Sequence, residues 1–163
     1  MEITSDVTLR GRDWNKAVTS LSTIFKNRTN YSLYILSVTL GIMYDRRIEN
    51  PDENGEEPKY VPRNVLQNRD NGKLDFLFQA AILSTQTEQL SEEQRLELAF
   101  GENVEFNRMG FLTQFANYGV TKLTECVGES PIETMENVKN FLFATVEGRN
   151  LEIDSLPDDV LLM

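Results

Sequence analysis

Apolar residues recur at three- and four-residue steps in several stretches of the chain, which is the pattern of amphipathic helices. The spacing predicts a helix over 13–25, with Asp13 as a candidate N-cap. Two further stretches, 31–44 and 73–85, are apolar on nearly every side, so we expect helices there that are buried between other elements. The β-branched residues of 31–44 leave a strand open as the alternative.

Two local signals mark where other helices begin. The string SEEQ at 91–94 is a capping-box pattern, and the helix that it opens is expected to stop at Gly101. The string SPIE at 130–133 combines a capping serine, a proline at the first helical position and a glutamate that closes the box. This second helix is predicted to run to about Glu147 and to be terminated by Gly148.

Residues 49–72 interrupt the helical pattern with turn formers and acids, and we expect a long surface loop there. Within this loop, 60–61 indicates a short extended piece and 63–68 a helical turn. The first ten residues alternate only loosely, as in a short strand or an ordered arm. Residues 151–163 are acidic, and we expect a short extended piece followed by a loose tail.

These elements together predict a mainly α, single-domain bundle of about five to six helices, with room for a small strand pair from the termini or the acidic loop. One helix is expected over 105–127, where Gly110 and Gly119 weaken the expectation that it is unbroken. The helical domain is expected to cover residues 1–150, and an acidic C-terminal tail to cover 151–163.

Composition narrows the class of protein. Of the 163 residues, 40% are hydrophobic and 26% are charged, a balance typical of a globular chain. No apolar run approaches the ~18–20 residues that span a bilayer, and the acidic N-terminus lacks the features of a signal peptide. The single cysteine, Cys126, excludes an internal disulfide. We therefore expect a cytoplasmic protein with no membrane association.

The net charge of −10 is unevenly distributed. Residues 1–48 hold seven Lys or Arg against four Asp or Glu, residues 49–124 hold seven against thirteen, and residues 125–163 hold two against nine. Acidic surfaces repel phosphate, which disfavours non-specific nucleic-acid binding by the whole chain. Plain solubility explains the acidity, and the alternatives are a local nucleic-acid contact in the basic third and docking of the acidic end to a basic partner.

Familiar catalytic groups are missing. The chain has no histidine, one cysteine and no glycine-rich phosphate loop, which removes the usual dyads, most zinc sites and nucleotide-binding motifs. Carboxylates on one helix are the remaining candidates for magnesium binding or acid–base chemistry, although a solvated helix surface is the favoured interpretation; they are Glu92, Glu93 and Glu97. The loop acids have the composition of a calcium loop without the ligand order of an EF-hand; they are Asp52, Glu53, Glu56 and Glu57. We expect no enzyme activity, no cofactor and no metal.

Several reactive or aromatic side chains are better explained as core. Cys126 lies in an apolar helical stretch, which favours a buried thiol over a reactive one. Trp14, Tyr31 and Tyr34 are favoured as core residues over base-stacking platforms, which need a basic setting.

Three arginines form the candidate contact site for a partner or a nucleic acid: Arg28, Arg46 and Arg47. They flank the two ends of the predicted 31–44 helix, so they need not form one patch. Arg46 and Arg47 also suit a helix C-terminus on electrostatic grounds alone.

The order of the motifs resembles a known family. The chain reads IFKN at 24–27, LGIMYDRRI at 40–48, LDFL at 74–77 and FLTQFANYG at 111–119. A helix that ends in a glycine–aromatic–basic corner, followed by FANYG, is similar to the fourth Dnd system-associated protein family, whose pattern is E-x-Y-A-N-x-G. These are small bacterial proteins encoded beside DNA phosphorothioation-dependent restriction systems, a class of phage defence. The resemblance spans roughly 24–145 by order of elements and carries no catalytic residues with it.

The resemblance implies a non-enzymatic accessory or adaptor subunit of a bacterial phage-defence system. Such a subunit would dock to a larger protein, for example an ATPase or a nuclease, and would reach DNA only indirectly. Two alternatives from other classes stay open: an acidic mimic of DNA that inhibits a DNA-binding enzyme, and a nucleic-acid-binding regulator that uses the basic first third. A carboxylate–metal enzyme is the remaining alternative.

Overall fold

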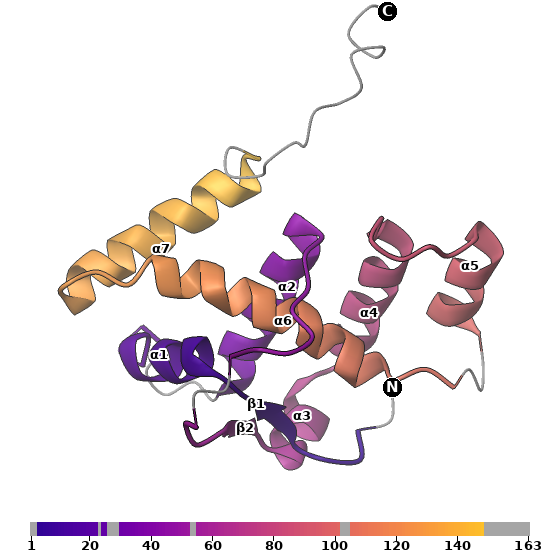
Figure 1. Ribbon diagram of the computed structural model, residues 1–163, viewed down its shortest axis with the longest axis horizontal. Helices are drawn as coiled ribbons and strands as arrows, with labels where there is room; N and C mark the ends of the chain where they lie inside the picture. Colours follow the sequence, from indigo (N-terminus) through magenta and orange to yellow (C-terminus); the bar gives the residue numbers. More distant parts are fainter. Residues whose placement is uncertain (1–2, 23, 26–29, 53–54, 102–104, 149–163) are drawn as a thin grey trace, which may run out of the picture.

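The computed structural model describes residues 3–22, 24–25, 30–52, 55–101 and 105–148. Within these ranges the protein is mainly helical, with seven helices and one two-stranded sheet, which confirms the predicted fold class (Figure 1). In chain order the elements are β1 Val7–Leu9, α1 Arg12–Ser20, α2 Asn30–Tyr44, β2 Lys59–Val61, α3 Arg63–Arg69, α4 Lys73–Ser84, α5 Glu92–Phe100, α6 Arg108–Glu125 and α7 Pro131–Val146.

The centre of the fold is the α2–α6 crossing, where Gly41 of α2 and Gly119 of α6 let the two backbones approach closely (Figure 1). A Cβ atom on Gly41 would overlap the carbonyl oxygen of Phe115, and one on Gly119 would overlap that of Ser37. Only glycine removes this overlap. The crossing therefore holds α2 as a buried helix, and the strand alternative for this stretch is wrong.

α6 is unbroken, although it contains both glycines that weakened this expectation. Gly119 is required by the crossing. Gly110 lies in the first turn, where its N–H donates to the Asn107 side chain at 2.9 Å and so satisfies one of the free amides of the helix end. Tertiary contact and capping thus outweigh the low helix propensity of glycine.

α1 is shorter than predicted: it ends at Ser20 and not at residue 25. Leu21 is still buried, and the amides of Ile24 and Phe25 donate to its carbonyl. The apolar residues after Ser20 therefore belong to turns that pack on the core. Asp13 is not the cap: Gly11 occupies that position, and Asp13 in the first turn accepts a hydrogen bond from Thr124 of α6 at 3.1 Å.

The small sheet ties the N-terminal segment to the predicted acidic loop. β1 and β2 are antiparallel, with Val7 opposite Val61, and the Asp6 carboxylate accepts from the Arg63 amide at 2.7 Å at the start of α3. The extended piece and helical turn predicted inside 49–72 are therefore confirmed as β2 and α3. The other end of the loop is also held, since the Asp52 carbonyl accepts from the Arg12 amide.

α4 and α5 lie side by side at one end of the molecule, and α7 extends from the other (Figure 1). α4 was expected to be buried on all sides, and this expectation is wrong: it buries one face and exposes Phe76 and Leu83. The reason is its place in the fold, because α2 and α6 cover only its inner side.

Both predicted helix starts are confirmed. Ser91 and Gln94 form the reciprocal capping box of α5, and Ser130 accepts from the Glu133 amide at the start of α7. The Glu133 carboxylate bonds the amide of Glu129 and not that of Ser130, so this second box is shifted by one residue. Gly148, with φ of 74°, ends α7 in the left-handed conformation that was expected there.

Candidate functional site

The corner after α2 holds two of the three predicted contact arginines. Asp45 ends the helix in the left-handed conformation, with φ of 47°. Its carboxylate accepts from the Thr85 hydroxyl and, at 2.8 Å, from the Gln86 amide. The corner is thereby bound to the segment that follows α4.

Arg47 points inward at this corner and is largely committed to internal contacts. Its guanidinium forms an ion pair with Glu88 at 2.6 Å and donates to Thr87 at 3.2 Å. It also lies 4.9 Å from the centre of the Phe111 ring, a cation–π contact. The side chain is 15% exposed, so it acts as a bridge between the corner, the α4–α5 segment and α6.

The other two arginines of the predicted contact site are placed differently. Arg46 is exposed at the same corner, and its amide donates to the Gly41 carbonyl at 3.1 Å. Arg28 lies outside the described residues. Arg46 and Arg47 are neighbours in the sequence, yet their surroundings differ: Arg46 is exposed, whereas Arg47 is largely buried.

Asn117, the asparagine of the FANYG motif, is a buried polar residue whose partners the sequence did not predict. It is 6% exposed; its side-chain oxygen accepts from the Trp14 indole at 2.9 Å, and its amide nitrogen donates to the Ile48 carbonyl at 3.0 Å. It thus connects α1, α6 and the chain after the corner. Together with Gly119, it gives the FANYG motif an architectural explanation, because both residues serve the packing around α6.

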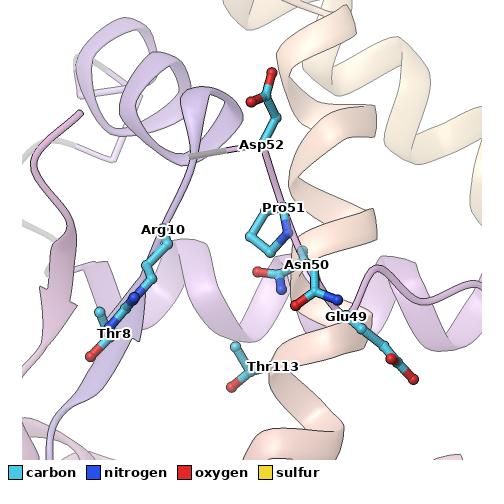
Figure 2. Close-up of a pocket in the computed structure, with 8 residues that line it drawn as sticks. Thr8, Arg10, Glu49, Asn50, Pro51, Asp52 and Thr113 are labelled. Carbon is cyan, nitrogen blue, oxygen red and sulfur yellow. The ribbon is translucent and has the colours of Figure 1, made fainter. Parts of the chain in front are cut away.

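A polar groove opens beside this residue (Figure 2). Figure 2 shows Thr8 and Arg10 on one side, the chain from Glu49 to Asp52 on the other, and Thr113 of α6 at the floor. The cavity has a volume of about 470 Å³. A second cavity of about 380 Å³ shares Thr8, Glu49 and Thr113 with it, so the groove continues toward the N-terminal turn of α6.

The chemistry of the polar groove is mixed. The residues that line it include one basic residue, Arg10, and two acidic residues, Glu49 and Asp52. Two polar groups at its floor are already engaged: Asn117 as described, and the half-buried Thr113, whose hydroxyl donates to the Met109 carbonyl at 2.8 Å and contacts the Tyr34 hydroxyl at 3.1 Å. Among the described residues, no group of three or more His, Cys, Asp or Glu is arranged to hold a metal ion.

Titratable groups in the core have structural partners. Burial, and secondly the charge of Asp70, raises the pKa of Tyr31 to about 12; the two side chains are joined by a hydrogen bond of 3.1 Å. Burial also raises the pKa of Tyr34 above its ordinary value. Cys126 is buried as predicted, and burial raises the pKa of its thiol to about 11, which opposes formation of the reactive thiolate. Trp14, Tyr31 and Tyr34 are confirmed as core residues.

Exposed apolar side chains gather at the two ends of the molecule. Eight of the eleven large hydrophobic residues that are exposed in the described chain lie on α4, α5 and α7; they are Phe76, Leu83, Leu96, Phe100, Ile132, Met135, Phe143 and Val146. Scattered single residues of this kind are ordinary on protein surfaces, whereas grouped ones mark interaction sites. None of these exposed faces was predicted from the sequence, and α4 was expected to be buried on all sides.

Comparison with family models, with curated proteins and with solved structures finds no match to this chain. Within the described residues, no helix is both long enough and apolar enough to cross a membrane.

Proposed function

We propose that the protein is a non-enzymatic adaptor that docks through apolar helix faces to a larger protein. The observation that carries the proposal is the grouping of exposed apolar side chains on α4, α5 and α7. Burial of such side chains against a partner is the main favourable term in most protein association. An adaptor of this kind needs no reacting groups of its own.

The polar groove supports an enzyme less well than the apolar faces support docking. The buried polar residue at the groove, Asn117, uses both polar atoms of its side chain in hydrogen bonds within the protein. A catalytic site usually combines an apolar cleft with convergent polar groups and perturbed titratable residues. Among the described residues, Tyr31, Tyr34 and Cys126 have strongly raised pKa values, and all three belong to the packed core.

The biological setting that we propose is a bacterial phage-defence system, associated with DNA phosphorothioation or a related DNA-targeting process. It is carried by the resemblance of the 40–48 corner and the FANYG motif alone. The larger partner would be the ATPase or nuclease subunit of such a system, and DNA would be reached through it. A regulator that binds DNA through Arg47 has less support, since this side chain is occupied by Glu88 and the Phe111 ring.

Affinity capture of the tagged protein from its native cells, followed by mass spectrometry, tests the proposal. We expect one larger protein to be recovered in constant ratio to the bait. The same partner should be lost from a variant in which exposed apolar residues are made charged at both ends, Phe76→Asp with Phe143→Asp. A matched variant with the same charge change on a polar surface, Gln86→Asp with Asn68→Asp, should retain it. Recovery of a lone monomer from wild-type cells contradicts the proposal.

A further inference from the structure

α7 carries apolar residues on two different sides. The inner side, with Val138 and the half-buried Phe141 and Leu142, packs against the core. Two threonines on this side, Thr134 and Thr145, are also buried, and Thr134 accepts from the Gly128 amide at 3.0 Å. These contacts of the inner side attach α7 to the rest of the described structure.

The outer side forms a second apolar row, here named the α7 stripe: Ile132, Met135, Phe143 and Val146. Their spacings of three, eight and three residues bring them back to one side of a helix with 3.6 residues per turn. Their exposed fractions run from 52% to 78%. The aliphatic part of Lys139 continues the row, because its nitrogen lies 6.0 Å from the centre of the Phe143 ring.

A row of acids borders the α7 stripe on the side away from the core. Glu133, Glu136 and Glu147 follow one another at steps of three and eleven residues and are exposed. Lys139 is the only basic residue of α7. The free side of α7 thus presents about 21 Å of apolar helix with a negative edge.

Charge decides between three occupants of the stripe. Residues 149–163 of this chain contain four acids and one base, so they would bring negative charge against a negative edge. A second copy is disfavoured for the same reason: two-fold symmetry places the same edge of each antiparallel helix against its equivalent, and the whole chain carries −10. A helix with a basic edge removes the repulsion and gains attraction.

We propose that the α7 stripe binds an amphipathic helix of a different protein, whose apolar face is bordered by Lys or Arg. The inference rests on the adaptor function proposed above and names the partner class for one of its faces. The partner helix lies along α7, covers Ile132 to Val146 and places its basic residues beside Glu136. The two amphipathic helices pair face to face, as in a coiled-coil zipper, with apolar anchors for affinity and charges for orientation and rate.

The test uses the full chain and two synthetic helical peptides of about 18 residues. One has Leu along one face bordered by Lys; the other has Glu in place of every Lys. We expect saturable binding of the Lys peptide in one-to-one ratio, at least tenfold tighter than the Glu peptide, by calorimetry. Ile132→Asp with Phe143→Asp should weaken binding of the Lys peptide at least tenfold.

Two matched charge variants distinguish binding to the acidic edge of α7 from attraction by the net negative charge of the protein. Glu136→Lys with Asn140→Lys should shift preference at least tenfold toward the Glu peptide. Gln89→Lys with Glu93→Lys makes the same charge change near the start of α5 and should shift it less than threefold. Equal shifts from the two variants would mean that the Lys peptide senses only net charge, and the inference would be wrong.

The other occupants give distinct results. If removal of residues 149–163 tightens binding of the Lys peptide tenfold or more, the chain's own C-terminal segment covers the stripe. If the wild type sediments as a dimer and Phe143→Asp dissociates that dimer, a second copy of the chain covers the stripe. Either result overturns the inference. A captured partner that is lost with Phe76→Asp and Phe100→Asp, but not with Phe143→Asp, leaves the adaptor function standing and removes α7 as its site.

Discussion

The α2–α6 crossing and α7 are both apolar helical regions, yet the fold treats them in opposite ways. At the crossing, Gly41 and Gly119 remove the side chains that would hold two helices apart, so each backbone packs directly on the other. Within the described ranges, α7 makes no such glycine-mediated contact, and the α7 stripe is exposed. The difference teaches that apolar content alone does not say whether a helix is internal; the small residues that permit close approach do.

The largest expected effect comes from filling the crossing. Gly119→Leu places a side chain where the Ser37 carbonyl lies, and we expect a loss of about 3 kcal/mol or more of unfolding free energy, or failure to fold. Gly119→Ala should also destabilise, although alanine stabilises an ordinary helix by up to about 1 kcal/mol over glycine. Urea unfolding measures both, and stabilisation by alanine would mean that the helices are not in close contact.

Gly110→Ala is the matched control in the same helix. Its new Cβ meets the movable Asn107 side chain and not a backbone carbonyl. We expect a change within about 1 kcal/mol, of either sign, because capping is weakened while helix propensity improves.

The next effect tests the two hydrogen bonds of Asn117, which join α6 to Trp14 of α1 and to the chain after the corner. Asn117→Leu leaves the Trp14 indole N–H and the Ile48 carbonyl without their partner. Each unpaired buried group costs about 1–3 kcal/mol, so we expect a loss of about 2–4 kcal/mol. Thermal unfolding followed by the fluorescence of the single tryptophan measures it. An unchanged midpoint would show that water replaces these hydrogen bonds.

A stabilising change is expected at the crossing itself. The Ser37 hydroxyl is buried and has no hydrogen-bond partner within the described residues. Ser37→Ala keeps the small size that the Gly119 contact needs and removes an unsatisfied polar group, so we expect a gain of about 1 kcal/mol. Urea unfolding measures the gain, with Ser84→Ala, on the exposed end of α4, as the control. Destabilisation by Ser37→Ala would show that the hydroxyl is satisfied.

Cys126, at the end of α6 before α7, gives a pH-dependent effect. Its thiol pKa is raised from 9.0 to about 11 in the folded protein, so the folded state holds this proton more tightly than the unfolded state. The associated stability is fully present below pH 9 and is lost as the pH rises from 9 to 11. The advantage of wild type over Cys126→Ala in unfolding free energy should shrink over this window. A constant difference would contradict the raised pKa.

The smallest effect is expected on the α7 stripe. Phe143→Asp should change the unfolding free energy by no more than about 0.5 kcal/mol, because this side chain is 57% exposed. Val138→Asp, five residues earlier on the inner side and 5% exposed, should cost several-fold more. Urea unfolding of the pair measures how different the two sides are. Equal losses would erase the distinction between α7 and the crossing.

Much of the fold was predictable from short-range signals. The starts at Ser91 and Ser130, the end at Gly148 and the extended piece at 60–61 depend on neighbours within a few residues, and all are confirmed. The burial of Trp14 and Cys126 also followed from helical spacing. Capping and periodicity are local properties of the chain, and so a single sequence reports them.

The candidate surfaces were less predictable. Arg47 is equally basic in sequence whether it faces solvent or Glu88, and only the packing of α6 against the corner distinguishes the two. The α7 stripe was not predicted, because spacing shows that a helix has an apolar side but not how many sides its neighbours cover. A warning signal was present: Ile132, Met135 and Phe143 fall on a different side from Val138.

The sequence by itself determined where the main helices lie, the starts at Ser91 and Ser130, the end at Gly148 and the lack of histidine-based chemistry, because residue types and local spacing are sufficient for these. The tertiary structure alone decided which apolar sides meet. It placed Gly41 and Gly119 at a contact between backbones 78 residues apart in the chain, and it left α7 covered on one side. The physical reason is that burial depends on what the rest of the chain brings near a surface, and that quantity is not local.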